Sequence, residues 1–368
     1  MTFGLYILWA GCVLCAFCIV NLIQLPLRRG RHPVLTPILM VVKFLLSVIA
    51  ALMEIALDTW LSWHAGFVLG ALHIALFADA AADLVLLIPL YRKKQPLGRK
   101  LFIVVSLVLT VALALYGTLN MQATARANEH TYTSAKLKEE HTFAFLSDLH
   151  VGTAQSPSTI ERSLQAIKES NPDFIVLGGD ITDEFTKKEE MQDIYRQFGA
   201  LGIPVYFVYG NHDRQAHNDL AGGRQYTPED LEQALNANGI VILKDRWVRI
   251  SDDLVLLGRE DVTVETRLDV SKLQSRPEGV YVVSVDHAPF QEQDIIDTKA
   301  DLQMSGHTHA GQMFPLRAAY NLLGYDALGD FRYGDTTVCV SAGISGWGIP
   351  YRTESNCVFE LVHLVPAR

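Results

Sequence analysis

The sequence predicts an α/β protein with a layered sheet covered by helices, preceded by an all-α region of four transmembrane helices. Two observations lead to this fold class. The first is a set of four long apolar segments, at about 4–25, 34–57, 66–90 and 101–118. The second is the later alternation of short β-branched or aromatic runs with amphipathic segments, which is typical of buried strands covered by helices. We therefore expect a membrane domain at 1–120, a polar linker at 121–140 and a second domain at 141–368.

Each apolar segment is long enough to span a membrane. A helix rises 1.5 Å per residue, so about 20 residues cross a hydrocarbon core of about 30 Å. These segments also explain the positive mean hydropathy of the chain, +0.18. A cleaved signal peptide fits poorly, because the basic cluster follows a long apolar run instead of preceding a short one. The sequence thus predicts a multi-pass protein of the cell membrane; the alternative is four buried helices of a water-soluble domain.

The charges of the loops between these segments predict an orientation. Lysine and arginine accumulate in the short cytoplasmic loops of membrane proteins. The second loop has none, whereas the first and third have these: Arg28, Arg29, Arg31, Arg92, Lys93, Lys94, Arg99 and Lys100. If the first and third loops are cytoplasmic, everything after residue 118 lies on the other side of the membrane. We therefore expect the domain at 141–368 to be extracytoplasmic.

Four ionisable residues fall within the predicted spans: Lys43, Glu54, Asp79 and Asp83. Charged groups inside a bilayer are costly, and they are candidates for function by default. They could pair between helices, or they could conduct protons or ions. We favour pairing, because the four spans contain no repeat or signature of a transporter.

The five cysteines divide into two groups. Cys12, Cys15 and Cys18 lie in the first span, where we expect them to act as small packing residues. Cys339 and Cys357 lie in the C-terminal strand region. They could form a disulfide if the domain is exported, although the sequence does not give the distance between them.

Five short polar motifs carry the candidate chemistry of the second domain. They are Asp148-Leu149-His150, Gly179 to Asp183, Gly210 to Asp213, His287 and Gly306 to His309. The first four follow strand-like runs, at 143–146, 174–177, 205–208 and 282–285. Ligands of open α/β sheets bind beyond the carboxyl ends of the strands. We therefore expect these motifs to meet at one edge and to assemble a centre for two metal ions.

The residue types suit such a centre. Asp148 and His150 are two positions apart on the end of a predicted strand, so we expect both side chains to face the same way. Asp180 is a single carboxylate that could bridge two ions, and Asn211 adds a neutral oxygen ligand. The candidate metal ligands are Asp148, His150, Asp180, Asn211, His287, His307 and His309. This mixture of oxygen and nitrogen donors favours Mn, Fe, Zn or Co over Ca or Mg.

In order and spacing, the five motifs resemble the pattern DxH, GDxxD, GNH[DE], H and GHxH of the calcineurin-like metallophosphoesterases. The resemblance extends over about 141–365. The stretch Gly306 to Gln312, followed by Pro315, resembles the membrane-associated bacterial branch of that family. It implies that Asp148, His150, Asp180 and His309 hold one ion, and that Asp180, Asn211, His287 and His307 hold the other. The resemblance further implies a layered β-sandwich core flanked by helices, and a catalytic His212 that acts on the transition state or the leaving group.

Neighbouring acids complete this expectation. We expect Asp213 to orient the imidazole of His212, as carboxylates often do for histidines at metal sites. Asp183, the last acid of GDxxD, either supports the ligands in the same way or is an acid at the start of a helix. Asp286 departs from the common Ser-His-x-Pro form of the fourth motif, which separates this chain from relatives of known substrate.

The resemblance implies a phosphoric ester hydrolase that attacks a mono-, di- or pyrophosphate ester with metal-activated hydroxide. A lipid-linked substrate is one candidate. The net charge of −9 and the lack of a basic stripe argue against a nucleic-acid partner. Two other classes stay open: a membrane sensor or transporter with a regulatory phosphoesterase domain, and a scaffold that only binds a partner.

Two further features concern the second domain. Its amphipathic segments predict helices at Ser158–Ser170, Met191–Leu201 and Pro228–Asn238. A glycine-rich segment, Gly343 to Arg352, contains apolar and aromatic residues. It could contact the membrane or a lipid-linked phosphate at the rim of the site, or it could be a turn that closes the C-terminal strands.

Overall fold

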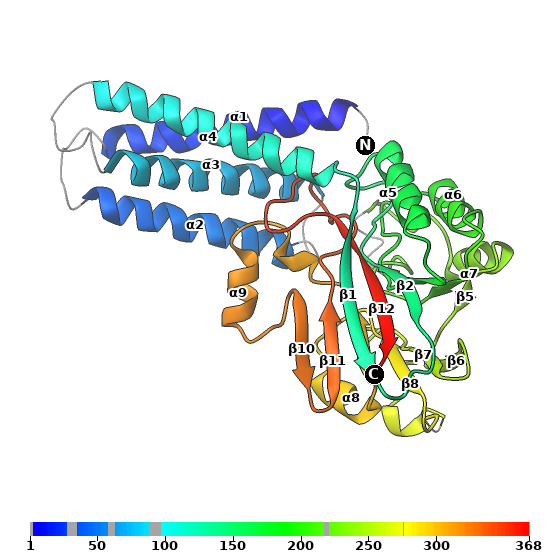
Figure 1. The fold of residues 1–368 in the computed structure, drawn as a ribbon. Coiled ribbons are helices and arrows are strands. Elements are labelled where there is room, and N and C mark those ends of the chain that lie inside the picture. The colour runs from blue at the N-terminus through cyan, green and yellow to red at the C-terminus, as the bar shows by residue number, and fades with distance from the viewer. Residues whose placement is uncertain are drawn as a thin grey trace. The chain divides into compact units, whose positions relative to one another are not determined.

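The computed structural model describes residues 3–27, 35–57, 63–87, 97–216, 221–274 and 276–367. They form two compact units, Met1–Asn120 and Met121–Arg368 (Figure 1). The first unit is all helical, and the second contains two six-stranded sheets with helices around them.

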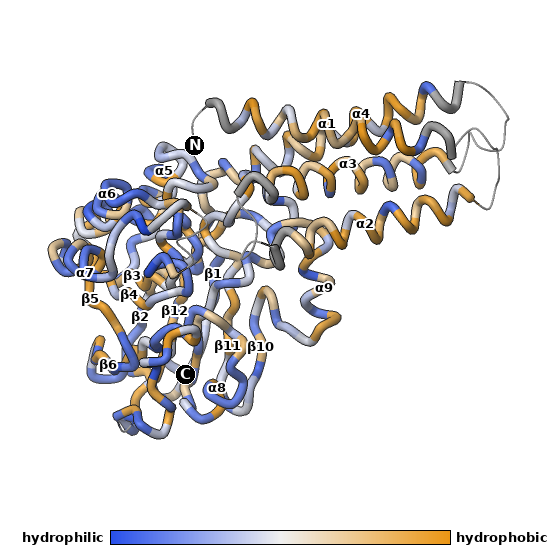
Figure 2. Tube along the Cα trace, turned by 180° about the vertical axis from the view of Figure 1, so that it is seen from behind, coloured by the Kyte–Doolittle hydropathy of each residue, from blue (hydrophilic) through white to orange (hydrophobic). Residues whose placement is uncertain are grey.

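The first unit consists of helices α1 (Phe3–Leu27), α2 (Leu35–Leu57), α3 (Trp63–Leu87) and α4 (Leu97–Met121). All four are long and apolar enough to cross a membrane, and apolar residues dominate their course in Figure 2. Helix α3 is the most buried of the four. In its candidate span 61% of the residues are buried, compared with 22–28% in the spans of the other three helices. The protein is therefore a membrane protein with four candidate spans, as the sequence predicts.

Buried polar contacts connect the helices of this unit. Lys43 Nζ of α2 lies 2.8 Å from Asp83 Oδ2 of α3. Gln24 of α1 donates to Asp79 of α3 at 2.7 Å. These contacts agree with pairing between helices, which lowers the cost of burying charge in a bilayer. The Glu54 side chain, and the loop residues at 28–34 and 88–96 that carry most of the orienting charge, lie outside the described residues.

Two mixed sheets form the centre of the second unit. The first has the order β1 (Arg126–Ser134), β12 (Val358–Pro366), β2 (His141–Leu146), β3 (Phe174–Leu177), β4 (Val205–Phe207) and β5 (Val241–Ile242). The second has the order β10 (Gly329–Tyr333), β11 (Thr336–Val340), β9 (Leu302–Ser305), β8 (Tyr281–Val285), β7 (Leu254–Gly258) and β6 (Arg246–Arg249). The predicted runs correspond to β2, β3, β4 and β8. Their pairings with β3, β4, β7 and β9 are parallel, so their carboxyl ends point the same way within each sheet.

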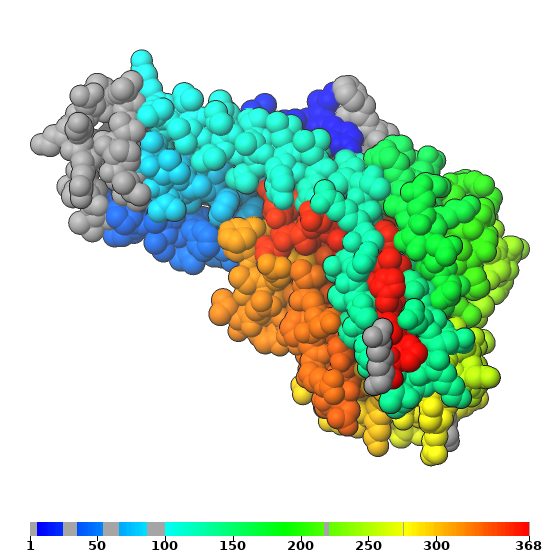
Figure 3. All heavy atoms as spheres, in the orientation of Figure 1, coloured from blue at the N-terminus to red at the C-terminus, as the bar shows by residue number. Residues whose placement is uncertain are grey.

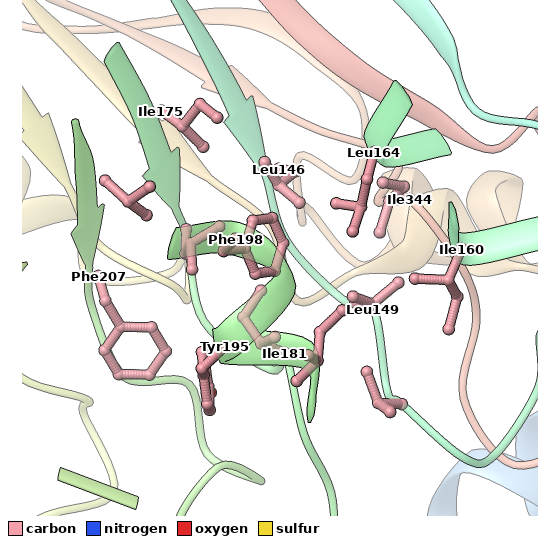
Figure 4. Close-up of a cluster of buried hydrophobic side chains, with 14 of the residues drawn as sticks. Leu146, Leu149, Ile160, Leu164, Ile175, Ile181, Tyr195, Phe198, Phe207 and Ile344 are labelled. Carbon is pink, nitrogen blue, oxygen red and sulfur yellow. The ribbon is translucent and has the colours of Figure 1, made fainter. Parts of the chain in front are cut away.

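Alternation along the strands produces the layers. In β2, Phe143 and Phe145 belong to an apolar cluster shared with strands of the second sheet, such as β8 and β9. Ala144 and Leu146 point to the other face and pack against helices. Figure 4 shows this outer cluster, in which Leu146 lies near Leu164 of α5 (Pro157–Glu169) and Phe198 of α6 (Lys188–Gly199). Helix α8 (Glu292–Thr298) covers part of the second sheet. The predicted class, a β-sandwich core flanked by helices, is confirmed.

Local sequence signals explain where the flanking helices begin. The Ser156 side chain accepts from the amide of Thr159, and Pro157 follows as the first residue of α5. In α7 (Pro228–Ala237), Thr227 and Asp230 cap each other's amides. Helix α9 (Leu316–Leu322) follows the fifth motif.

The expected linker at 121–140 is wrong, because this stretch is part of the folded unit. Residues Arg126 to Ser134 form β1, which pairs in parallel with β12 along its whole length; Figure 3 shows the two segments side by side on the surface. Leu137 is buried between the sheets. The strand is polar because it lies at an edge with most of its residues exposed, so the apolar pattern that predicts buried strands is missing.

Cys339 and Cys357 are both buried, and neither forms a disulfide. Cys339 belongs to the cluster between the sheets, and Cys357 belongs to the cluster beneath the helices. They therefore pack in different layers and do not form the disulfide that the sequence left open.

Candidate metal centre

The candidate ligands lie in loops that follow β2, β3, β4, β8 and β9. The structure brings six of them into two groups. One contains Asp148, His150 and His309; the other contains Asp180, His287 and His307. Within each group, the potential ligand atoms lie within 4.8 Å of one another. Residues as far apart in the chain as Asp148 and His309 are thus gathered into two adjoining clusters of nitrogen and oxygen donors.

Asp180 lies between the two groups. Its Oδ2 atom is 2.9 Å from His287 Nε2 and 3.9 Å from His150 Nε2. One carboxylate oxygen is therefore close to a histidine from each group, which is the position that a bridging ligand requires.

Several potential ligand atoms of these residues are buried and have no hydrogen-bond partner among the described residues. They are Asn211 Oδ1, His150 Nε2 and His309 Nδ1. A buried polar atom without a partner costs about 1–3 kcal/mol. His287 Nδ1 is 2.8 Å from the Gly178 carbonyl, which directs Nε2 toward Asp180. Divalent cations in the two groups would satisfy these atoms, so the residues fit a binuclear metal site.

The backbone places the ligands through unusual conformations. Asp148, His150, Asp180, His307 and His309 have φ angles of 59°, 45°, 53°, 72° and 49°. This left-handed region is uncommon for residues other than glycine. Strand β2 ends at Leu146, so the expectation that Asp148 and His150 share a direction through strand alternation is wrong. Their loop is instead held by the amides of Asp148 and His150, which donate to the carbonyls of Gly179 and Asp180.

Two glycines are required by close approach to the ligands. A Cβ atom at Gly210 would lie 2.2 Å from Asp180 Oδ1, and one at Gly306 would lie 2.5 Å from Asp148 Oδ2. A side chain at either position would displace a ligand carboxylate. The glycines of GNHD and GHTH are thus part of the geometry of the centre.

Comparison with known proteins agrees with this geometry. A sequence profile described as "Calcineurin-like phosphoesterase" matches residues 141–311. The second unit belongs to the calcineurin-like phosphoesterase family. Members of this family generally depend on metal ions.

The relatives found include membrane proteins. A "Transmembrane protein with metallophosphoesterase domain" of Danio rerio is 28% identical over 287 residues, which cover 71% of this chain and 62% of the relative. An "Uncharacterized metallophosphoesterase" of Helicobacter pylori is 26% identical over 243 residues, which cover 63% and 61% of the two chains. The chain thus spans about three fifths of the length of these relatives.

His212 of the phosphoesterase unit does not contact Asp213 as expected. Its Nδ1 atom lies 2.7 Å from Glu184 Oε2. The buried Asp213 carboxylate instead accepts the amides of Asp180, Ile181, Thr182 and Gly210 at 2.8–3.1 Å. The predicted orienting role of Asp213 toward His212 is therefore wrong: Asp213 fixes the backbone that carries Asp180, and Glu184 holds the imidazole.

Sequence reasoning missed Glu184, although it directly follows the GDxxD motif. Burial disfavours the charged form of His212, but the negative charges of Asp180 and Glu184 outweigh burial and raise its pKa to about 10. Cations in the adjoining groups would act in the opposite direction. Glu184 thus positions Nδ1 of the ring and favours a proton on that nitrogen.

The two other acids near the site also have definite contacts. Asp183 Oδ2 lies 3.5 Å from His150 Nδ1, so Asp183 faces a candidate ligand, and its other oxygen accepts the amides of Phe185 and Thr186. Asp183 is not an acid at the start of a helix, because the amides it accepts belong to a turn and α6 begins only at Lys188. Asp286 is paired with Arg267 at 2.6 and 3.1 Å, which compensates its charge beside the centre.

We predict that Asp180→Asn lowers metal content at both sites and hydrolysis by orders of magnitude, because the neutral amide cannot bridge two cations. Metal analysis of purified protein and hydrolysis of a phosphate ester would measure both effects. Asp193→Asn is the matched control, since Asp193 is exposed on α6 and contacts only Arg196 and Gln197. Two metals per chain with normal turnover in Asp180→Asn would contradict the bridging role.

We predict that Glu184→Gln reduces turnover about 10- to 100-fold, the usual effect of losing the partner of a functional histidine. Metal content should stay unchanged, because Glu184 contacts His212 and is not a candidate ligand. Steady-state kinetics and metal analysis would test this, with the exposed Glu189→Gln as the control. A Glu184→Gln protein with unchanged turnover would show that the contact does not matter for function.

Proposed function

We propose that this protein is a membrane-anchored phosphoesterase that hydrolyses a phosphate mono-, di- or pyrophosphate ester with two divalent transition-metal ions. The observation that carries the proposal is the pair of adjoining donor groups, with Asp180 between them and with buried donor atoms that lack protein partners. In this proposal Asp148, His150, Asp180 and His309 hold one ion. Asp180, Asn211, His287 and His307 hold the other. The donors suit Mn, Fe, Zn or Co.

The residues around the ions have separate tasks in this mechanism. When bound, the two ions would activate a water molecule and neutralise the charge of the phosphoryl group. His212 stabilises the transition state or gives a proton from Nε2 to the leaving oxygen, while Glu184 keeps the Nδ1 proton in place. Asp213 acts only indirectly, by holding the backbone at Asp180 and Gly210.

We further propose that the substrate is lipid-linked. The four spans keep the domain at a membrane, so an amphiphilic phosphate ester would be available to it. Exposed apolar residues also follow the fifth motif: Phe314, Leu322, Leu323 and Tyr325 are 44%, 88%, 69% and 45% exposed. The ring of Phe290 connects this surface to the centre, because its centroid lies 5.5 Å from that of His307 and 5.2 Å from that of Tyr325. Such a surface suits hydrocarbon next to a bound phosphate.

The other classes of function make a different prediction for the isolated domain. In a sensor or transporter, the buried pairs of the first unit, such as Lys43 with Asp83, would carry the function. A scaffold would not need the complete set of donors that this centre retains. If a protein lacking residues 1–120 still hydrolyses test esters, the enzymatic proposal stands, and complete loss of hydrolysis by a folded protein would favour the alternatives.

We predict that the full-length protein hydrolyses at least one of a panel of mono-, di- and pyrophosphate esters when Mn, Fe, Zn or Co is added. His212→Ala should keep both metals and lose about 10²- to 10⁴-fold in rate, the range of general acid–base assistance. The loss should be smaller for a good leaving group, which needs no proton. Loss of metal without any dependence on the leaving group would contradict the proposed role of His212.

We also propose that residues 121–368 lie outside the cytoplasm, on the basis of three basic residues in the first loop, none in the second and five in the third. Reporter fusions at residue 122 and at the C-terminus would measure this. We expect activity at both positions from a reporter that works only outside the cytoplasm. Activity of a cytoplasm-only reporter at both positions would reverse the orientation and favour cytosolic substrates.

A further inference from the structure

The glycine-rich segment Gly343 to Arg352 lies directly against the candidate metal centre. The ring centroid of Trp347 is 4.9 Å from that of His212, with an angle of 34° between the planes. It is 6.4 Å from that of His150. A Cβ atom at Gly343 would lie 2.9 Å from the Asp148 Cβ. The segment is therefore more than a turn that closes the C-terminal strands.

Gln312 ties the backbone of Trp347 to the loop that carries His307 and His309. Its side-chain oxygen accepts the Trp347 amide at 3.0 Å, and its side-chain nitrogen donates to the Trp347 carbonyl at 3.1 Å. The same nitrogen lies within hydrogen-bonding distance of the carbonyls of Ile349 and Tyr351, at 3.3 and 3.1 Å. One side chain, three positions after His309, thus fixes where the indole is placed.

Arg352 fixes the segment from its other end. Its buried guanidinium donates to the carbonyl of His309 at 3.2 Å and also to the carbonyls of Ala342 and Ser345. The metal-ligand loop and the glycine-rich segment are therefore connected at two points, Gln312 and Arg352. A change at either point would move Trp347 relative to the centre.

From these contacts we propose that Trp347 is a positioning residue for His212 and that Gln312 acts through Trp347. This inference rests on the proposed phosphoesterase function. The contact between His212 and Glu184 positions Nδ1 but does not by itself define the plane of the imidazole. The indole centroid lies 4.9 Å from the imidazole centroid at 34° between the planes, so the indole restricts the tilt of the ring. Contacts between flat aromatic rings have this directional character.

Substitutions of Trp347 and Gln312 should have different effects on the rate of hydrolysis. Trp347→Leu keeps an apolar side chain but removes the flat surface, and Trp347→Phe restores a ring. Gln312→Glu keeps the size but turns a donor toward three carbonyls into an acceptor. If Gln312 acts through Trp347, the double variant Trp347→Leu/Gln312→Glu should be little worse than either single variant, because contacting residues are not additive.

The test uses the full-length protein and two aryl phosphate esters, one with a good nitrophenolate leaving group and one with a poor phenolate leaving group. We expect Trp347→Leu and Gln312→Glu to lose about 10- to 100-fold on the phenyl ester, as for partners of functional groups, and much less on the nitrophenyl ester. Metal content should match the wild type, and Trp347→Phe should recover most of the rate. Modification of His212 by diethyl pyrocarbonate, followed by mass spectrometry, should be faster in the two impaired variants, because the ring is less restricted.

Equal loss on both esters, loss of metal, or unchanged modification of His212 would overturn the positioning role. Additive losses in the double variant would overturn the link between Gln312 and Trp347. If the wild type hydrolyses neither ester nor any other phosphate ester with any of the four metals, the proposed function itself fails; equal losses in an active protein overturn only the positioning role.

Discussion

The candidate centre depends on the buried carboxylate of Asp213. It accepts backbone amides from Asp180, Ile181, Thr182 and Gly210, and so joins the loop after β3 to the loop after β4. The loop after β3 carries Asp180, which lies between the two donor groups. The loop after β4 carries Asn211 and His212. Hydrogen bonds to a charged acceptor are stronger than neutral ones, and four of them replace the water that this carboxylate loses on burial. The relative position of Asp180 and His212 therefore depends on an acid that acts through backbone amides, together with the amide of His212, which donates to Asp180 Oδ1 at 2.8 Å.

Elements whose signals lie in their own sequence could be predicted, whereas elements that form only through pairing with distant parts of the chain could not. Strands such as β2, β3, β4 and β8 were predictable because they are buried on both faces and read as unbroken apolar runs. Helix starts were predictable from caps such as Thr227 with Asp230. In contrast, β1 is a polar edge strand that becomes a strand only by pairing with β12, which is more than 200 residues away. Its own sequence contains no signal for that pairing.

The site shows the same division. The ligand types were visible in the motifs, and their convergence followed from the ends of strands. The partner of His212 was not predictable, since Asp213 is adjacent in sequence whereas Glu184 is brought in from the preceding loop. The role of Trp347 was equally hidden, because it depends on Gln312 and Arg352 bridging two segments about 40 residues apart. Proximity in sequence indicated which loops matter but not which side chains touch.

The parallel pairing of β1 with β12 has a consequence for how the protein is made. Strand β12 lies between β1 and β2 in the first sheet, although it is the last strand in the chain. The sheet therefore cannot be completed until residues 358–366 have been synthesised, and until then β1 and β2 have no strand between them. Folds dominated by such distant pairings form slowly. Residues 358–366 thus determine when this domain is finished, and a chain truncated before them leaves β1 and β2 without the strand that pairs with both.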